Sequence, residues 1–368
     1  DLLDGAVTRE TTRVLQPVDD ASPALIIYTS GTTGAAKGAV LSHGNLEANG
    51  RNVVDAWRIT ADDRYLAVLP LFHVHGLGNG IHGWLISGCL MRLQERFDQK
   101  DAARWFREFK PTLFFGVPTI YVRLNDPAVI PDADLKAIRK TMRLFVSGSA
   151  PLSTDDFKKF RTRFDHDILE RYGMSEALMI TTNPYDGDRR PGTVGEPFPG
   201  VRVRVIGEEG AEMMESEPGE LQVRSPALFR SYWRNDKATK AAFTADGWFR
   251  TGDLGERSPL GFYTLHGRKH DLIISGGFNI YPSEIENVLT ACDGVREAAV
   301  VGAKDPVRGE VPVAYIVADK AASDALLERA CKAQLASFKT PRAFVRVDSL
   351  PRTALGKIQK HLLPAWEP

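Results

Sequence analysis

The chain has 368 residues, of which 43% are hydrophobic and 26% are charged, and its 47 basic and 47 acidic side chains give a formal net charge of zero. A chain of this length and composition can bury a large core and is too long for one small domain. The charge balance argues against a broad nucleic-acid footprint or a patch that binds an anionic membrane.

The first half of the chain alternates short apolar runs with helical stretches. The runs predict buried strands at 24–28, 65–69, 112–115 and 143–147. A helix is predicted to begin near Ser42, because the apolar residues from Leu46 to Trp57 recur at helical spacing on one face. A second helix is predicted from Ser153, which is followed by acidic residues in the first turn. This alternation predicts layered α/β structure.

The pattern changes after Pro191. Valines alternate with arginines over 201–205, as in a half-exposed strand, and short strands interrupted by Gly and Pro follow at 220–224 and 262–265. These three runs predict a small antiparallel β subdomain.

The last hundred residues show a strand, helix, strand, strand, helix, strand order. The strands are predicted at 271–275, 298–301, 312–317 and 343–347, and the helices at 282–291 and 323–336. We therefore expect two domains: a large one over 1–269 and a small α+β domain over 270–368.

A loop rich in hydroxyls and glycine follows the first predicted strand. Residues 28–38 read Tyr-Thr-Ser-Gly-Thr-Thr-Gly-Ala-Ala-Lys-Gly. Glycines let backbone N–H groups turn inward around an anion, and a lysine adds a point charge, so the loop suits a polyphosphate. It is not a Walker loop, because glycine follows the lysine. The alternative is a flexible surface loop. The candidate nucleotide-binding residues are Thr29, Ser30, Gly31, Thr32, Thr33, Gly34 and Lys37.

This loop resembles the signature phosphate loop of the adenylate-forming superfamily, which includes acyl-CoA synthetases, luciferases and peptide-synthetase adenylation domains. Further motifs of that family follow in its order: Tyr172-Gly173-Met174-Ser175-Glu176, Gly252-Asp253, Gly267-Arg268 and the run from Pro351 to Lys357. Because together they cover nearly the whole chain, the protein is identified as a member.

The resemblance implies a two-step reaction that uses ATP, Mg²⁺ and coenzyme A. A carboxylate first attacks the α-phosphate of ATP, giving an acyl adenylate and pyrophosphate, and the CoA thiol then displaces AMP. The family's catalytic lysine matches Lys357, which reaches from the small domain to the carboxylate and α-phosphate. Its magnesium-binding glutamate matches Glu176. The small domain is expected to be mobile and to rotate between the two steps.

The resemblance also assigns the remaining nucleotide and CoA contacts. Tyr172 is expected to stack on adenine, and Asp253 and Arg268 to contact the ribose. Residues that accompany them in the matched motifs are Ser149, Ala150, Pro151, Gly173, Met174 and Ser175. Gly276 and Gly277 match the loop that lines the pantetheine tunnel. The hinge position, usually Asp or Lys in the family, holds His270, which suggests either a tolerated substitution without consequence or a pH-sensitive rotation.

Finer resemblances concern the acid. Segments 72–77, 116–124 and 183–189 resemble malonyl-CoA synthetases. The resemblance implies that Arg123 binds a distal carboxylate, helped by His75, while His73 gates the reacting centre. A long-chain acyl pocket would need apolar residues there, whereas a cation suits a second carboxylate.

Several alternatives stay open at this point. The acid could be methylmalonate or a short monocarboxylate, the acceptor could be a carrier protein, and the chain could be a non-catalytic fragment or nucleotide-binding module.

Family members carry a further N-terminal stretch before the phosphate loop, which we expect to be missing here. We expect small-molecule partners only. The apolar run 84–90 is too short to cross a bilayer, and three scattered cysteines are typical of a reduced, cytoplasmic protein.

Overall fold

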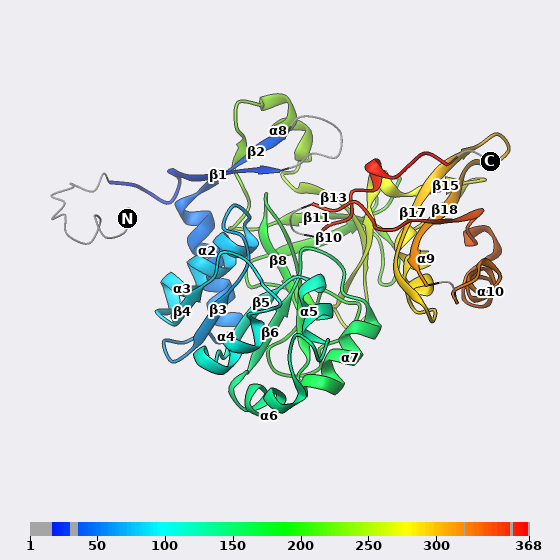
Figure 1. Cartoon of the computed structure of the whole chain (residues 1–368). Helices are drawn as coiled ribbons and strands as arrows, with labels where there is room; N and C mark the ends of the chain where they lie inside the picture. The colour runs from blue at the N-terminus through cyan, green and yellow to red at the C-terminus, as the bar shows by residue number, and fades with distance from the viewer. Residues whose placement is uncertain (1–16, 30–35, 320, 354–355, 367–368) are drawn as a thin grey trace.

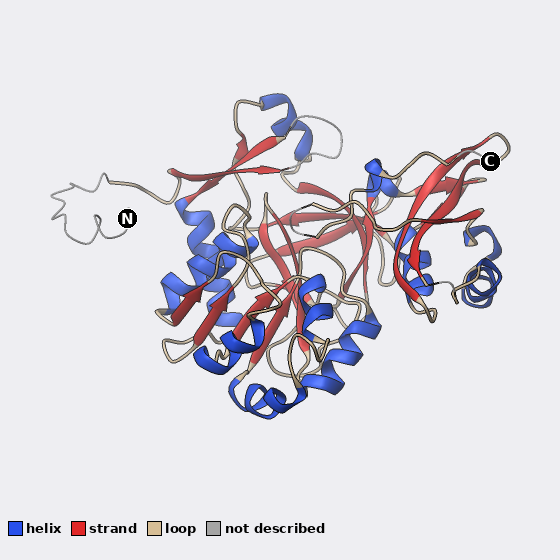
Figure 2. Cartoon of the chain, in the orientation of Figure 1, coloured by secondary structure: helices blue, strands red, loops and turns tan. Residues whose placement is uncertain are grey.

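The computed structural model describes residues 17–29, 36–319, 321–353 and 356–366. Over these residues the chain forms four separate β-sheets, with helices packed around the largest of them (Figures 1 and 2). The predicted α/β fold class is confirmed.

The largest sheet has seven strands in the order β4-β3-β5-β6-β7-β8-β9. Strands β4 to β7 are parallel, and β8 and β9 join antiparallel. The strands are β3 (Arg64–Ala67), β4 (Leu90–Leu93), β5 (Leu113–Gly116), β6 (Leu144–Ser147), β7 (Ile168–Met174), β8 (Leu178–Thr182) and β9 (Glu196–Pro197). The helices around it are α2 (His43–Ala56), α3 (His82–Ser87), α4 (Ala102–Phe109), α5 (Pro118–Leu124), α6 (Asp132–Thr141) and α7 (Thr154–Phe164), together with the π-helical segment η1 (His75–Ile81).

Two helix starts follow the predicted capping residues. The Ser42 side chain accepts from the backbone N–H of Asn45, and the Asn45 side chain accepts from the backbone N–H of Ser42. The two bonds form a capping box at the start of α2. The Ser153 hydroxyl accepts from the Asp156 N–H at the start of α7. Local chemistry therefore fixes where both helices begin.

Aromatic packing makes the centre of this sheet rigid. All residues of β5 and β6 are buried, because helices cover both faces. Phe145 of β6 packs edge-on against Phe160 of α7 at 4.9 Å and against Tyr121 of α5 at 6.4 Å between ring centroids. Helices α5 and α7 are thereby locked to the same strand.

The predicted strand 24–28 forms, but the prediction that it is buried is wrong. Strand β1 (Pro23–Thr29) pairs antiparallel with β2 (Lys37–Ser42), which also pairs with β12 (Ser231–Tyr232). Of the β1 side chains only Ile27 is buried. The strand lies at the edge of a separate three-stranded sheet, so just one of its faces packs on the core. A short continuous apolar run cannot distinguish this case from a fully covered strand.

The predicted antiparallel subdomain is a four-stranded sheet in the order β10-β11-β13-β14. Its strands are β10 (Arg202–Ile206), β11 (Gly219–Arg224), β13 (Phe249–Arg257) and β14 (Tyr263–Arg268), and helix α8 (Asp236–Ala242) lies between β12 and β13 in the chain.

The C-terminal part has its own five-stranded sheet and its own core. Its elements are β15 (Ile273–Ser275), β16 (Phe278–Ile280), α9 (Pro282–Thr290), β17 (Val295–Asp305), β18 (Gly309–Ala318), α10 (Asp324–Gln334) and β19 (Ala343–Arg346). All predicted elements are present, and β16 was missed. The predicted division between 269 and 270 falls in the short helix η2 (Lys269–Asp271), which joins β14 to β15. Across the described ranges, no helix is both long and apolar enough to pass through a membrane.

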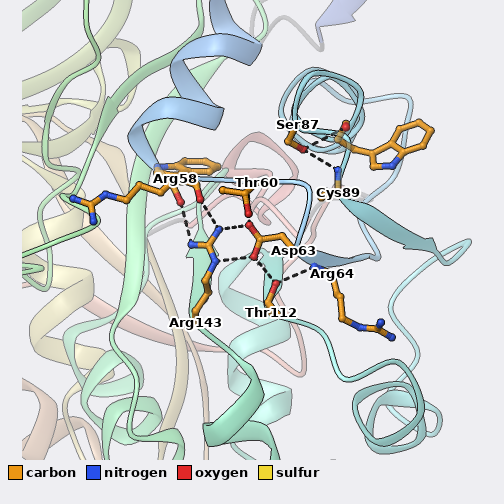
Figure 3. A network of polar contacts seen from close by, with 10 residues as sticks. Arg58, Thr60, Asp63, Arg64, Ser87, Cys89, Thr112 and Arg143 are labelled. Atoms are coloured by element: carbon orange, nitrogen blue, oxygen red, sulfur yellow. Dashed lines mark hydrogen bonds and ion pairs between the residues drawn. The ribbon is translucent and has the colours of Figure 1, made fainter.

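A buried ion pair ties together the amino ends of three parallel strands. The Asp63 carboxylate accepts from the Thr60 N–H at 2.9 Å, the Thr112 hydroxyl at 2.7 Å and Nε of Arg143 at 2.7 Å (Figure 3). The Asp63 side chain is only 5% exposed. These residues precede β3, β5 and β6, so the pair fixes the edge of the sheet opposite the strands' carboxyl ends.

We expect Asp63→Ala to lower the free energy of unfolding by about 3–5 kcal/mol, because it leaves the Arg143 guanidinium without its carboxylate partner. Chemical denaturation measures the change. Glu47→Ala, which removes an exposed i,i+4 partner of Arg51, should cost less than about 1 kcal/mol. Equal losses in the two variants would contradict the role given to Asp63.

Candidate active site

The predicted site segments gather at one edge of the seven-stranded sheet, namely the edge formed by the carboxyl ends of its parallel strands. The segments that contain His73, Pro118, Ser149 and Glu176 each follow the carboxyl end of a parallel strand, β3, β5, β6 and β7 respectively. Because parallel strands end at the same edge, these segments lie beside one another, where open α/β sheets bind their ligands.

On one side of this edge, Asp253 is held by two predicted nucleotide contacts. The Tyr172 hydroxyl donates to Oδ2 of Asp253, and Nε of Arg268 lies 3.0 Å from Oδ1. Arg268 also donates to the Thr251 carbonyl at 3.1 Å. Burial and then the Asp253 charge raise the pKa of Tyr172 well above its ordinary value, so the phenol remains a donor. The carboxylate is therefore fixed in orientation before any ligand arrives.

The Lys357 amine lies at the same place although it belongs to the C-terminal part. Burial and the neighbouring Arg268 charge lower the pKa of Lys357, while Asp253 and Glu176 oppose the shift. The residue is nevertheless still exposed to solvent, so a ligand can reach it. The Lys357 charge also lowers the pKa of His73. The amine is thus near both the predicted nucleotide contacts and the predicted acid contacts.

The loop that carries Lys357 is fixed at both of its ends. A Cβ on Gly356 would lie 3.2 Å from Oγ1 of Thr119 at the start of α5, so the loop touches the large part directly. The Thr353 N–H donates to the Lys357 carbonyl at 2.9 Å. Arg352 donates to the Glu297 carboxylate of β17 at 2.9 Å. The loop is therefore part of the C-terminal fold and rests on α5.

Glu176 is buried beside Tyr232, which pairs with the strand that begins with Lys37. The Tyr232 hydroxyl donates to its Oε1 at 2.9 Å, and the Lys37 ammonium lies 5.2 Å from the centroid of the same tyrosine ring. Thr29 and Lys37 pair across β1 and β2, where the Thr29 hydroxyl donates to the Lys37 carbonyl at 3.3 Å. Ser30, Gly31, Thr32, Thr33 and Gly34, which complete the predicted loop, lie outside the described residues.

His73 and His75 form the opposite side of the edge. The His75 N–H donates to Nδ1 of His73 at 3.2 Å, and Nδ1 of His75 lies 3.1 Å from the Ser149 hydroxyl. Burial, then the Arg171 charge, lowers the pKa of His73 to about 4 and that of His75 well below its ordinary value. Both rings are neutral at pH 7. The backbone donor at Nδ1 places the His73 proton on Nε2.

Sequence analysis missed Arg171, which lies under this region. It is 4% exposed, and within the described part of the chain neither its Nε nor its Nη2 has a hydrogen-bond partner. The guanidinium packs against Gly148, where a Cβ would come within 2.4 Å of Cζ. Burial lowers its pKa to about 9, so it is charged at neutral pH. Its place directly before Tyr172 was the available signal, because strand alternation sends the two side chains to opposite faces.

Arg123 is exposed in the last turn of α5. It lies one turn beyond Thr119 on the same face of the helix, which is the face that the Lys357 loop touches. The structure thus puts Arg123 at the rim of the site and not at its floor.

The other predicted residues divide into two groups. Gly173, Met174 and Ser175 continue β7 toward Glu176, and Ala150 and Pro151 follow Ser149, whose backbone has φ of +72°. Gly276 and Gly277 form the exposed turn between β15 and β16, with open space where a Cβ would be. His270 lies in η2 with Nε2 3.5 Å from the Asp271 carboxylate. The last three residues are not part of the assembled edge in this conformation, and all these roles stay predictions.

Comparison with known proteins identifies the class. Residues 3–233 match the family model described as AMP-binding enzyme, and residues 284–357 match the AMP-binding enzyme C-terminal domain. The chain therefore belongs to the AMP-binding enzyme family, which confirms the resemblance to adenylate-forming enzymes.

Individual relatives refine this picture. The chain is 37% identical over 366 residues to a malonate–CoA ligase of Arabidopsis thaliana, covering 92% of this chain and 60% of the relative. It is 39% identical over 362 residues to a sulfoacetate–CoA ligase of Cupriavidus necator, covering 96% and 69%. The ATP-bound structure of MatB from Rhodopseudomonas palustris superposes with a TM-score of 0.91 at 41% identity, covering 98% of this chain and 71% of that one.

These comparisons leave the acid open. The chain spans about three-fifths of the first curated relatives it matches, 61% and 60% of their lengths. Relatives of similar identity are named for different acids. The choice of acid therefore depends on the pocket.

The low pKa of His73 makes stability depend on pH. The unfolded imidazole takes up its proton near pH 6.5 and the folded one near pH 4, so between these values acid favours the unfolded chain. We expect His73 to account for a loss of about 2 kcal/mol between pH 7 and pH 5. Urea unfolding of the wild type and His73→Gln at both pH values measures it. A variant that loses as much stability on acidification as the wild type would contradict the assignment.

Proposed function

We propose that the protein is an ATP-dependent acid–CoA ligase that works through an acyl adenylate, with malonate as its acid. The observation that carries the proposal is the contact of the Lys357 loop with Thr119 at the start of α5, which brings the amine near both Asp253 and His73. A single cation between nucleotide contacts and acid contacts suits the joining of a carboxylate to the α-phosphate.

In the first step an oxygen of the acid carboxylate forms a bond to the α-phosphorus, and the bond to pyrophosphate breaks. Two anions must approach, so the barrier is largely electrostatic. Lys357 compensates the charge on the carboxylate and the α-phosphate. His73 is neutral with its proton on Nε2, so it offers a hydrogen bond without adding charge. Asp253, held by Tyr172 and Arg268, receives the ribose hydroxyls.

The donor set fits a magnesium ion bound with ATP. Glu176 offers a buried carboxylate with one oxygen engaged by Tyr232, and Mg²⁺ commonly takes one protein carboxylate together with phosphate oxygens. When bound, the ion neutralises phosphate charge. Lys37 supplies a further cation at the phosphate loop.

In the second step the CoA thiolate attacks the acyl carbon and AMP leaves. This requires the Lys357 loop to move away from α5. The exposed turn at Gly276 and Gly277 suits the incoming pantetheine arm, because glycine leaves room for a slim chain. His270 in η2 lies at the predicted hinge.

The choice of malonate rests on cations beside the acid contacts. Arg123 stands at the rim and Arg171 lies below His73 and His75. A second anionic group on the acid complements both, whereas a monocarboxylate leaves the buried Arg171 guanidinium without an anionic partner. Methylmalonate is the second candidate, since it carries the same two carboxylates.

We expect Lys357→Ala to slow adenylation by roughly two to three orders of magnitude, while a chemically supplied acyl adenylate still reacts with CoA. Pyrophosphate release measures the first step, and thioester formation from the adenylate measures the second. Lys332→Ala, an exposed lysine of α10, serves as the matched control. Equal loss in both steps would sink the role proposed for this amine.

We expect Arg123→Ala to lower kcat/KM for malonate about 10- to 100-fold, the range for a lost hydrogen bond to a charged group. Butyrate activation should not fall. Pyrophosphate release with malonate, methylmalonate, acetate and butyrate gives the comparison, with exposed Arg104→Ala of α4 as control. A parallel fall for malonate and butyrate would show that Arg123 does not select the acid.

A further inference from the structure

We propose that Tyr232 is a positioning residue that couples the magnesium-binding carboxylate of Glu176 to the phosphate-binding Lys37. The inference rests on the proposed function, since it takes these two charged groups as contacts of MgATP. It concerns the phosphate end of the nucleotide alone and involves neither the acid nor CoA.

A single buried side chain contacts both charged groups. Tyr232 is 7% exposed. Its hydroxyl donates to Oε1 of Glu176 at 2.9 Å, while the Lys37 ammonium lies 5.2 Å from its ring centroid. The hydroxyl thus makes the hydrogen bond to the carboxylate and the ring makes the cation–π contact with the ammonium, so a single side-chain conformation makes both contacts.

The backbone around Tyr232 is held in place by hydrogen bonds on both sides. The Arg230 N–H donates to the Val40 carbonyl at 3.0 Å, and the Trp233 N–H donates to the Gly38 carbonyl at 2.7 Å, which fixes the segment to the strand that begins with Lys37. On the other side, the Phe229 N–H donates to the Glu176 carbonyl at 2.6 Å. Residues 229–233 therefore connect the strand after the phosphate loop to the turn that carries Glu176.

The hydroxyl determines which carboxylate oxygen remains for the ion. Of the two carboxylate oxygens of Glu176, only Oε1 accepts a hydrogen bond from a side chain of the described residues, and that side chain is Tyr232. Hydrogen-bond partners of a metal-binding carboxylate fix its orientation, and losing one typically weakens metal binding 10- to 100-fold.

The ring has a separate effect. An aromatic face under an ammonium stabilises it and limits where it can go. Tyr232→Phe removes the hydroxyl and keeps the ring, whereas Tyr232→Leu removes both. The two variants therefore separate the magnesium effect from the phosphate effect.

The test measures equilibrium ATP binding by calorimetry, without acid or CoA, at a series of free Mg²⁺ concentrations and in EDTA. For Tyr232→Phe we expect the half-saturating Mg²⁺ concentration to rise about 10-fold, with ATP affinity in EDTA unchanged. Tyr232→Leu should in addition weaken ATP binding in EDTA about 2- to 5-fold. The matched control is Tyr263→Phe, which removes another buried hydroxyl that donates to the Val203 carbonyl at 3.0 Å.

An unchanged magnesium dependence in Tyr232→Phe would overturn the proposal. So would an equal loss of ATP affinity with and without Mg²⁺, because that result describes packing and not metal positioning. Unfolding midpoints confirm that the variants are folded. A wild type that binds no ATP refutes the proposed function and this inference together, while ATP binding without malonate activation refutes only the choice of acid.

Discussion

The site depends on one amine, that of Lys357, which belongs to the C-terminal part but lies beside residues of the large part. Lys357 belongs to a loop clamped to β17 by the ion pair of Arg352 with Glu297, yet Asp253 in the four-stranded sheet acts to raise the Lys357 pKa, and the Lys357 charge helps to lower the pKa of His73 beyond β3. In the adenylation step proposed above, each part therefore contributes some of the positive charge that a carboxylate facing a polyphosphate requires. In that step the amine can act only while the two parts are docked, and the edge that it meets is firmly built.

That firmness comes from packing beneath the edge. The aromatic side chains of β6, α5 and α7 interlock, and the Asp63–Arg143 pair fixes the opposite ends of the same strands. The groups that must meet ligand then need only short extensions from rigid strands. By contrast, the C-terminal part reaches the site through a turn at Gly356 and is joined to the body by η2. A rigid platform and a separately folded arm suit a reaction whose two steps need different groups at one place.

Much of this organisation could be predicted from the sequence because it depends on short local patterns. Ser42 and Ser153 predict helix starts through their capping chemistry, and the motif residues Tyr172 and Asp253 meet in the structure as neighbours of one nucleotide side. What could not be predicted depends on pairing at long range. The exposure of β1 follows from which sheet it joins, and the bond from Tyr232 to Glu176 joins residues 56 positions apart. The magnesium, CoA and hinge assignments of Glu176, Gly277 and His270 remain predictions.

Arg171 carries a consequence for how this protein can change. A buried guanidinium with two nitrogens lacking partners among the described residues weakens the fold, and an apolar residue of similar volume would relieve that burden. Selection for heat tolerance alone should therefore favour replacement at this position, whereas selection for activity on acidic substrates should keep the charge. At this arginine, selection for stability and selection for activity therefore favour different residues.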